Sequence, residues 1–332
     1  MNSHPAEPES RPKHGGRFAA RLVCCFTLLL TLHGALGATI TNPLMPGADP
    51  HAISIGQSVW IYPTWSKGAA PQFFAFASED LQHWQRHGPV LDFADVSWIK
   101  DDGQAQHFPW APAIIERQGV FYFYYSVGPQ RQTPARIGVA RGDTPAGPFR
   151  DSGKPLLTGE KGFEAIDPMV FLDPQSGKYL LYAGGSAGAG LKVFELNDDL
   201  ISIAREIKTG RPPKFTEGAF MHYAEGIYHL TYSHGRWREA SYSVHYATAL
   251  TPTGPWTYRG ALLESDNKHK GPGHHSIIQD PANGQWLIVY HRWNGTSGDG
   301  PYKGMRRVAI ERIEYGADGA ILPIRMSDAW TR

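Results

Sequence analysis

The chain has 332 residues, with 32 basic and 31 acidic side chains, a formal net charge of +1, and 12% aromatic residues. This balance leaves no basic stripe for nucleic acid and no polybasic face for an anionic membrane. Many aromatic rings with modest charge instead suit an uncharged ligand, such as a neutral carbohydrate, held by ring faces and hydrogen bonds.

Residues 1–37 resemble an export signal rather than part of the fold. Four basic residues precede the apolar run LVCCFTLLLTLHGALG, and small residues allow cleavage near Gly37. The run is short for a membrane span, so we expect a secreted or periplasmic protein without stable membrane association; a retained anchor is the alternative. Both cysteines, Cys24 and Cys25, lie in this segment, so the mature chain would fold without disulfides and carry 28 basic and 29 acidic side chains.

A repeat of roughly 50 residues runs through the rest of the chain. Residues separated by 61, 57, 50 and 57 positions open each unit: Asp49, Trp110, Asp167, Glu217 and His274. An apolar run follows each of them, and then a hairpin glycine: Gly56, Gly119, Gly177, Gly226 and Gly284. An aromatic-rich run follows each glycine. Such a period made only of strands predicts an all-β fold, a single five-bladed β-propeller over residues 38–332.

Other segments refine this prediction. LQHWQRHGPVL (81–91), TPAGPFRDSGKPLL (144–157) and TPTGPWTYRGALL (251–263) fit outer hairpins of blades. RRVAIERIEY and GAILPIRMSDAW are expected to complete the last blade, and TITNPL near the start can close the ring. Only residues 197–207 have a pattern compatible with a short helical turn. The alternative is a β-sandwich in which the spacing arises by chance.

Four Asp-Pro pairs provide an internal control for the carboxylates. Asp173 and Asp280 come directly before a hairpin glycine, which is typical of a turn. Asp49 and Asp167 come one strand earlier, in the strand that lines the channel of a propeller, and Glu217 holds the same register. Three carboxylates converging on one channel indicate acid/base hydrolysis.

Five motifs in order resemble glycoside hydrolase family 43: ADPH (48–51), FPWAP (108–112), AIDPMVF (165–171), TEGAF (216–220) and GPGHHS (271–276). The resemblance covers about residues 42–325. It implies a five-bladed propeller that removes arabinose or xylose from plant cell-wall polysaccharides with inversion. It also implies that Asp49 is the general base, Glu217 the general acid and Asp167 the carboxylate that tunes the acid.

The same resemblance assigns further residues to substrate binding. His274 is similar to a channel histidine that coordinates Ca²⁺ in many relatives, and here water would supply most other ligands. Trp110 matches the tryptophan beside the sugar, and Phe108 is a second aromatic candidate. Arg306 is similar to the arginine that contacts the glycone, with Arg307 the alternative register and Arg292 a weaker candidate.

The chemistry of inversion sets conditions on these carboxylates. An acid must protonate the leaving oxygen while a base activates water on the opposite face, with about 6.5–9.5 Å between the two carboxyl groups. Burial and the like charge of Asp167 are expected to raise the pKa of Glu217, whereas Asp49 needs hydrogen bonds that keep it ionised.

Three functions remain open at this point. The favoured one is an exo-acting α-L-arabinofuranosidase or β-xylosidase, working as a monomer. An endo-α-1,5-L-arabinanase would use the same fold, and loops such as 92–107 and 265–272 would decide between a pocket and an open cleft. A non-catalytic carbohydrate-binding propeller is the third, although retention of all three carboxylates argues against it.

Overall fold

The computed structural model describes residues 38–65, 70–130, 134–186 and 190–332. The predicted export signal over residues 1–37 lies outside the described residues. Within the described ranges, no helix has the length and apolar character needed to cross a bilayer. The only helix named among them is the short 3₁₀ turn η1 (Phe93–Asp95), so the prediction of an all-β fold is confirmed.

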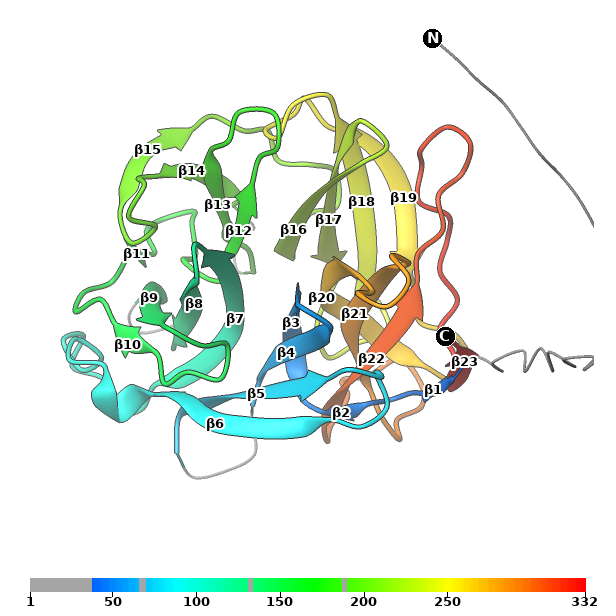
Figure 1. Cartoon of the computed structure of the whole chain (residues 1–332), viewed down its shortest axis with the longest axis horizontal. Coiled ribbons are helices and arrows are strands. Elements are labelled where there is room, and N and C mark those ends of the chain that lie inside the picture. Colours follow the sequence, from blue (N-terminus) through cyan, green and yellow to red (C-terminus); the bar gives the residue numbers. More distant parts are fainter. Residues whose placement is uncertain (1–37, 66–69, 131–133, 187–189) are drawn as a thin grey trace, which may run out of the picture. The chain divides into compact units, whose positions relative to one another are not determined.

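Five antiparallel sheets surround a common centre, as Figure 1 shows. Blade I contains β3 (Ala48–Ile55), β4 (Ser58–Thr64), β5 (Gln72–Ser78) and β6 (Gln85–Asp92). Blade II contains β7 (Phe108–Arg117), β8 (Val120–Gly128), β9 (Arg136–Gly142), β10 (Arg150–Asp151) and β11 (Leu157–Thr158). Blade III contains β12 (Met169–Leu172), β13 (Tyr179–Ala183), β14 (Lys192–Leu196) and β15 (Ile203–Ile207). This arrangement confirms the five-bladed β-propeller.

The last two blades complete the ring. Blade IV contains β16 (Glu217–Ala224), β17 (Ile227–His234), β18 (Ser243–Ala249) and β19 (Thr257–Leu263). Blade V contains β20 (Lys270–Gln279), β21 (Trp286–Trp293) and β22 (Arg306–Arg312), and its fourth strand is β2 (Met45–Pro46) from the start of the fold. The sheets are arranged around a centre rather than stacked face to face, so the β-sandwich alternative is wrong.

Ring closure differs in one respect from the expectation. The run RRVAIERIEY supplies β22, but the outer edge of blade V comes from β2, which pairs Met45 with Val308. The end of the chain forms β23 (Ala329–Thr331), which pairs with β1 (Thr39–Thr41) in a separate two-stranded sheet. Joining the two ends of the chain in this way means that no blade is left with a missing strand at the closure.

The local predictions fare as follows. All five hairpin glycines have positive φ values between 59° and 80°, which glycine adopts without steric cost: Gly56, Gly119, Gly177, Gly226 and Gly284. The expected outer hairpins join the third and fourth strands of blades I, II and IV. The helical turn expected at 197–207 is wrong, because a turn there leads into β15, which pairs with β14.

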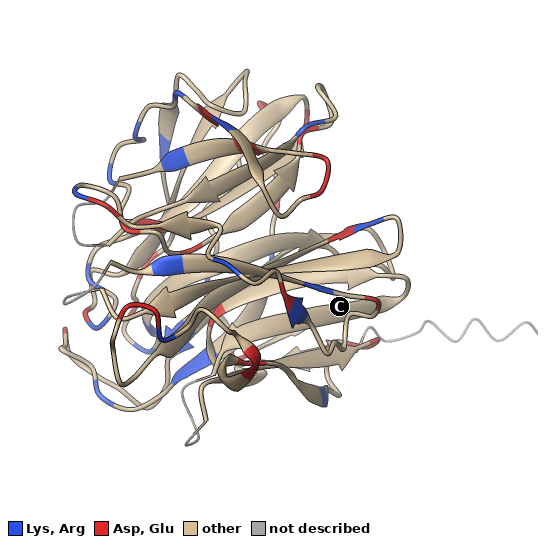
Figure 2. Cartoon of the chain, turned by 90° about the vertical axis from the view of Figure 1, so that its left-hand side faces the viewer, with Lys and Arg blue, Asp and Glu red and all other residues tan. Residues whose placement is uncertain are grey.

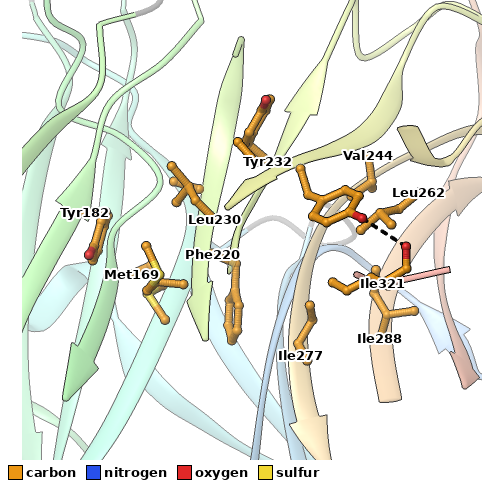
Figure 3. Close-up of a cluster of buried hydrophobic side chains, with 14 of the residues drawn as sticks. Met169, Tyr182, Phe220, Leu230, Tyr232, Val244, Leu262, Ile277, Ile288 and Ile321 are labelled. Carbon is orange, nitrogen blue, oxygen red and sulfur yellow. Dashed lines mark hydrogen bonds between the residues drawn. The ribbon is translucent and has the colours of Figure 1, made fainter. Parts of the chain in front are cut away.

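Apolar side chains between neighbouring blades form the core. Figure 3 shows one such cluster, in which Met169 and Tyr182 of blade III meet Phe220 and Leu230 of blade IV. The cluster continues through Ile277 and Ile288 of blade V. In contrast, charged residues of both signs are scattered over the loops and strands seen in Figure 2. The blades therefore hold together by apolar burial, and each can present a polar side chain at the centre.

Candidate active site

A backbone kink at the start of each inner strand positions the candidate site. The residues at the kink all have positive φ values between 33° and 63°: Asp49, Ala111, Asp167, Gly218 and His274. Such values are uncommon for residues other than glycine and persist where surrounding contacts hold them. Trp110 and Glu217 are one residue earlier, so the expectation that all five opening residues share one register is wrong for these two.

A side chain of the preceding blade holds four of the five kinks. The backbone N–H of Ala111 donates to Thr64 Oγ1 at 2.7 Å, and that of Asp167 donates to Ser126 Oγ at 2.9 Å. The N–H of His274 donates to Ser233 Oγ at 2.8 Å. The N–H of Asp49 donates to His291 Nδ1 at 3.0 Å. In these four steps the second strand of one blade fixes the inner strand of the next blade, which was not expected from the sequence.

The step from blade III to blade IV is different and brings two carboxyl groups together. A Cβ atom on Gly185 would lie 2.5 Å from the Cβ of Glu217, so no side chain fits there. The N–H of Gly218 donates instead to Asp167 Oδ2 at 3.0 Å. Asp167 therefore takes the place of the missing hydroxyl, and this contact holds its carboxyl group beside the strand that carries Glu217.

Asp49 lies among cationic and imidazole groups. Arg306 Nη1 is 2.9 Å from Asp49 Oδ1, His291 Nδ1 is 3.3 Å away and His274 Nδ1 is 3.8 Å away. Burial would raise the pKa of Asp49, but the Arg306 guanidinium, followed by His274, outweighs it, and the pKa lies well below its usual value. Asp49 is therefore an ionised carboxylate at neutral pH.

Glu217 and Asp167 shift in the other direction. Burial raises the pKa of Glu217, and the charge of Asp49 adds to this, while the hydroxyl of Tyr242, which donates to Glu217 Oε1 at 2.8 Å, lowers it in part. Burial, then Glu217 and Asp49, raise the pKa of Asp167. Because the net pKa of both groups is raised, this pair holds a proton at a pH at which Asp49 is ionised.

His274 lies between the carboxyl groups, with Nδ1 3.6 Å from Asp167 Oδ2 as well as 3.8 Å from Asp49 Oδ1. Burial lowers its pKa, although Asp49 opposes this. Over the described part of the chain, no three His, Cys, Asp or Glu side chains are grouped so as to hold a metal ion. A Ca²⁺ ion at His274 would therefore depend on water for most of its oxygen ligands.

Of the three candidate arginines, only Arg306 contacts the carboxylate cluster among the described residues. Arg306 contacts Asp49, whereas Arg307, the alternative register, follows it on the opposite face of β22. Arg292 is buried away from the carboxylates: its Nη1 donates to the Ser327 carbonyl at 3.0 Å, and its Nη2 is 3.6 Å from Asp328 Oδ1. It does not join the cluster, because its neighbour His291 occupies the face of β21 turned toward Asp49.

Two hollows that share Trp65 in their linings adjoin this cluster through Thr64 and Arg306. The larger, about 850 Å³, is lined by Thr64, Trp65, Phe108 and Trp110 and by much of loop 92–107. The rings of Phe108 and Trp110 stack at 5.9 Å with 8° between their planes, and Phe108 is 42% exposed. Both aromatic candidates therefore line an open cleft, in which a sugar ring has room to stack.

The smaller hollow, about 400 Å³, contains a tryptophan that sequence reasoning missed. Ala48, Trp65 and Arg306 line it together with Trp237, which is 45% exposed. The Arg306 guanidinium lies 4.8 Å from the Trp237 ring centre, and Trp293 stacks on Trp237 at 5.8 Å. Trp237 lies in a loop with no repeat signal, and only its exposure marks it.

Comparisons with known proteins show the family to which the chain belongs. The sequence pattern of "Glycosyl hydrolases family 43" matches residues 40–321. The chain is 35% identical to a β-D-galactofuranosidase of Aspergillus niger, over 86% of this chain and 85% of that protein. It is 28% identical to xylosidase/arabinosidase 43A of Humicola insolens, over 83% of this chain and 95% of that protein.

Solved structures show the same likeness. An α-L-arabinofuranosidase from Clostridium thermocellum superposes with a TM-score of 0.68 at 29% identity, covering 86% of this chain and 96% of that chain. A β-xylosidase/α-arabinofuranosidase from a compost metagenome, in complex with xylotriose and free of calcium, gives 0.68 at 28% identity, covering 87% of this chain and 98% of that chain.

Proposed function

The chain is a member of glycosyl hydrolases family 43, and on that premise we propose that it is an exo-acting, inverting glycosidase with Asp49 as base and Glu217 as acid. The observation that carries these roles is the opposite shift of pKa within one buried cluster. Asp49 is ionised beside Arg306, while the coupled pair Glu217 and Asp167 retains a proton. Two carboxyl groups with divergent pKa values are the requirement for acid/base glycoside hydrolysis.

In the proposed reaction, the Glu217 carboxyl group donates its proton to the glycosidic oxygen as the bond from that oxygen to the anomeric carbon breaks. Water attacks the anomeric carbon from the opposite face, and Asp49 accepts a proton from that water. The sugar leaves with inverted configuration, and the two carboxyl groups return to their starting states by exchange with solvent. Asp167 raises the proton affinity of the acid, and Arg306 keeps the base ionised.

We propose a furanoside or xyloside as the substrate, because the relatives named above act on such sugars. Two candidates share one ring shape: a β-D-galactofuranoside has the ring configuration of an α-L-arabinofuranoside and an additional exocyclic CH₂OH group. The higher identity to the galactofuranosidase favours keeping this sugar as a second candidate. The exposed rings of Phe108 and Trp237 and the half-buried ring of Trp110 are the surfaces on which sugar rings would stack.

The test is hydrolysis of three aryl glycosides, an α-L-arabinofuranoside, a β-D-xyloside and a β-D-galactofuranoside. Asp49→Asn and Glu217→Gln should each lower kcat/KM by about 10²–10⁴ on the preferred substrate. Asp173→Asn is the matched control, since it changes an Asp-Pro carboxylate that stabilises a turn by accepting from the N–H of Gln175. Wild-type rates in both site variants would refute the roles, and proton NMR of the first-formed anomer checks inversion.

Exo action is part of the proposal, and endo-arabinanase action is its alternative. Loop 92–107 lines the larger hollow through residues that include Phe93, Lys100 and His107, so this loop shapes the space available to a polymer. Release of monosaccharides alone from linear arabinan supports exo action. Early appearance of longer oligosaccharides would support the endo alternative.

Three further proposals concern the state of the protein. Export with cleavage near Gly37 is checked by N-terminal sequencing of the secreted form, and a monomeric state by light scattering.

A Ca²⁺ ion at His274 is supported by the position of this imidazole between two carboxyl groups. If the ion is present, a chelator should lower the activity of the wild-type protein and added Ca²⁺ should restore it, whereas the activity of His274→Gln should not respond to the chelator. An unchanged wild-type activity in the presence of the chelator would refute the proposal.

A further inference from the structure

Tyr242 contacts the proposed acid, Glu217, although it is not one of the residues that open the repeated units. It precedes β18, is 1% exposed and donates its hydroxyl hydrogen to Glu217 Oε1 at 2.8 Å. Ser233 also lies close to this hydroxyl group. Because Oε1 accepts from Tyr242, the proton that Glu217 delivers to a substrate belongs on its other oxygen, Oε2.

His291 plays the corresponding part for the proposed base. It is fully buried, and its Nδ1 accepts the N–H of Asp49 at 3.0 Å. Burial, followed by Arg306, lowers the pKa of His291 well below its usual value, so the ring is neutral and its hydrogen is on Nε2. Within the described chain, Nε2 has no hydrogen-bond partner, which is unusual for so deeply buried a group.

The two rings lie against each other. The centres of Tyr242 and His291 are 5.7 Å apart, with 13° between the ring planes. Space for this stack comes from Gly273, which pairs with His291 across β20 and β21. A Cβ atom on Gly273 would lie 2.0 Å from Tyr242 Cε1, so any side chain there would displace the ring.

The other blades show why a histidine is needed. At the equivalent positions a hydroxyl group, from Thr64, Ser126 or Ser233, accepts the backbone N–H of the next blade. A hydroxyl would therefore hold Asp49 as well. Unlike a hydroxyl group, the imidazole presents a flat ring to Tyr242, in addition to a nitrogen that lies 3.3 Å from Asp49 Oδ1.

We propose that Tyr242 and His291 are positioning residues, a stacked pair that fixes the acid Glu217 relative to the base Asp49. This inference depends on the roles proposed above for those two carboxyl groups. A rigid spacer matters here because inversion requires a set gap for the attacking water, and small displacements of catalytic groups are costly in rate. Asp49, Asp167 and Arg306 also face the acid, so its titration reports all of these neighbours together.

Two variants separate the parts of the pair. Tyr242→Phe retains the ring but removes the donor to Glu217, so kcat should fall about 10- to 100-fold with KM changed less than about threefold. His291→Ser retains an acceptor for Asp49, as in blades II and IV, but removes the ring, and kcat should fall in the same way. The double variant should lose less than the product of the two, since both changes disrupt one unit.

A second readout needs no substrate. The hydrogen bond from Tyr242 lowers the pKa of Glu217, so in Tyr242→Phe the side-chain carboxyl carbon of Glu217, followed by NMR, should titrate at higher pH. The alkaline limb of the pH–activity profile should move up with it. Tyr246→Phe is the matched control, because this buried tyrosine of β18 donates to the carbonyl of Ile321 instead.

The outcomes distinguish this inference from the proposed function. If Tyr242→Phe and His291→Ser keep wild-type kcat and the Glu217 titration, the positioning role is wrong while the catalytic assignment stands. If neither Asp49→Asn nor Glu217→Gln lowers activity, the catalytic assignment fails first. A shifted Glu217 titration together with reduced kcat, in variants whose melting temperature is unchanged, supports the pair.

Discussion

Asp49 and Glu311 are both buried carboxyl groups near an arginine of blade V. Asp49 lies in the channel, whereas Glu311 lies at the seam, the set of contacts among Asn42, Ile310, Glu311 and Ser327 where the ring closes. Arg306 Nη1 contacts Asp49 Oδ1 at 2.9 Å, and the pKa of Asp49 is lowered. Arg292 points to Ser327 and Asp328 instead, and burial raises the pKa of Glu311 to about 7. Burial acts on both groups in the same sense, so the direct contact with a cation decides the charge state.

At the seam, the carboxyl group of Glu311 accepts hydrogen bonds that hold the two ends of the fold together. Glu311 Oε1 accepts from the backbone N–H of Ser327 at 2.7 Å and from Asn42 Nδ2 at 3.1 Å. Asn42 also donates to the Ile310 carbonyl and accepts from the Ile310 N–H, both at 2.9 Å. These contacts join the start of the fold to its end, and they do not require Glu311 to be charged.

The largest expected effect comes from removing the cation at the site. Arg306→Met would leave Asp49 buried without its partner, so we expect about 3–5 kcal/mol of lost stability near neutral pH. A lowered pKa stabilises the fold above the unfolded pKa of about 3.8, and the gain shrinks as pH falls below that value toward the folded pKa, so the difference in stability between wild type and variant should narrow in acid. Thermal melts from pH 3 to pH 8 measure this.

The same variant tests function separately. With Arg306 gone, the pKa of Asp49 should rise, and the acidic limb of the pH–activity profile should move to higher pH. Arg307→Met is the control from the opposite face of β22. An unmoved acidic limb in Arg306→Met, with intact folding, would contradict the view that this arginine keeps the base ionised.

A smaller effect is expected at the seam. Asn42→Ala removes three hydrogen bonds and leaves the buried N–H and carbonyl of Ile310 without this partner, so stability should fall by about 1–3 kcal/mol. Denaturant unfolding measures the loss. Activity per folded molecule should stay at the wild-type value, because the seam does not contact the channel cluster; a specific loss of kcat would show that closure controls the site.

The smallest effect concerns Glu311→Gln, which retains the shape and the acceptor for Ser327. Because its folded pKa of about 7 exceeds the unfolded value of about 4.5, wild-type stability should decline as pH rises between these values and stay level above them. The variant should lack this decline and be the more stable form at pH 8. Parallel pH profiles for the two proteins would show that Glu311 does not titrate in that window.

The five-bladed fold and most predictions of local structure were confirmed, whereas the helical turn expected at 197–207 was wrong. Glycines at the hairpins, aromatic strand runs and the contrast between Asp49 and the turn residue Asp173 all follow from backbone preferences within a few residues. The one-residue displacement of Glu217 was missed, because the residue spacing alone does not show which residue of each unit lies at the positive-φ kink. The roles of the site residues stay predictions.

The alternation of side chains along a strand explains which arginines face the channel. Neighbours on a strand face opposite sides, so either Arg306 or Arg307 could reach the channel, and only the pairing of β22 with β21 selected Arg306. The same alternation turned His291 toward Asp49 and Arg292 away from it. Arg306 therefore contacts the cluster at Asp49, and Arg292 does not.

The amino-acid order by itself indicated the blades, their turns and which carboxylates would approach the centre, because five repeated strand units of similar length favour a ring of blades. The tertiary structure decided the charge on each carboxyl group, the rings of Tyr242 and His291 beside them, and the strand that closes the ring. Those features depend on side chains separated by up to hundreds of residues, and their interaction energies exist only once burial brings them within a few ångströms of one another.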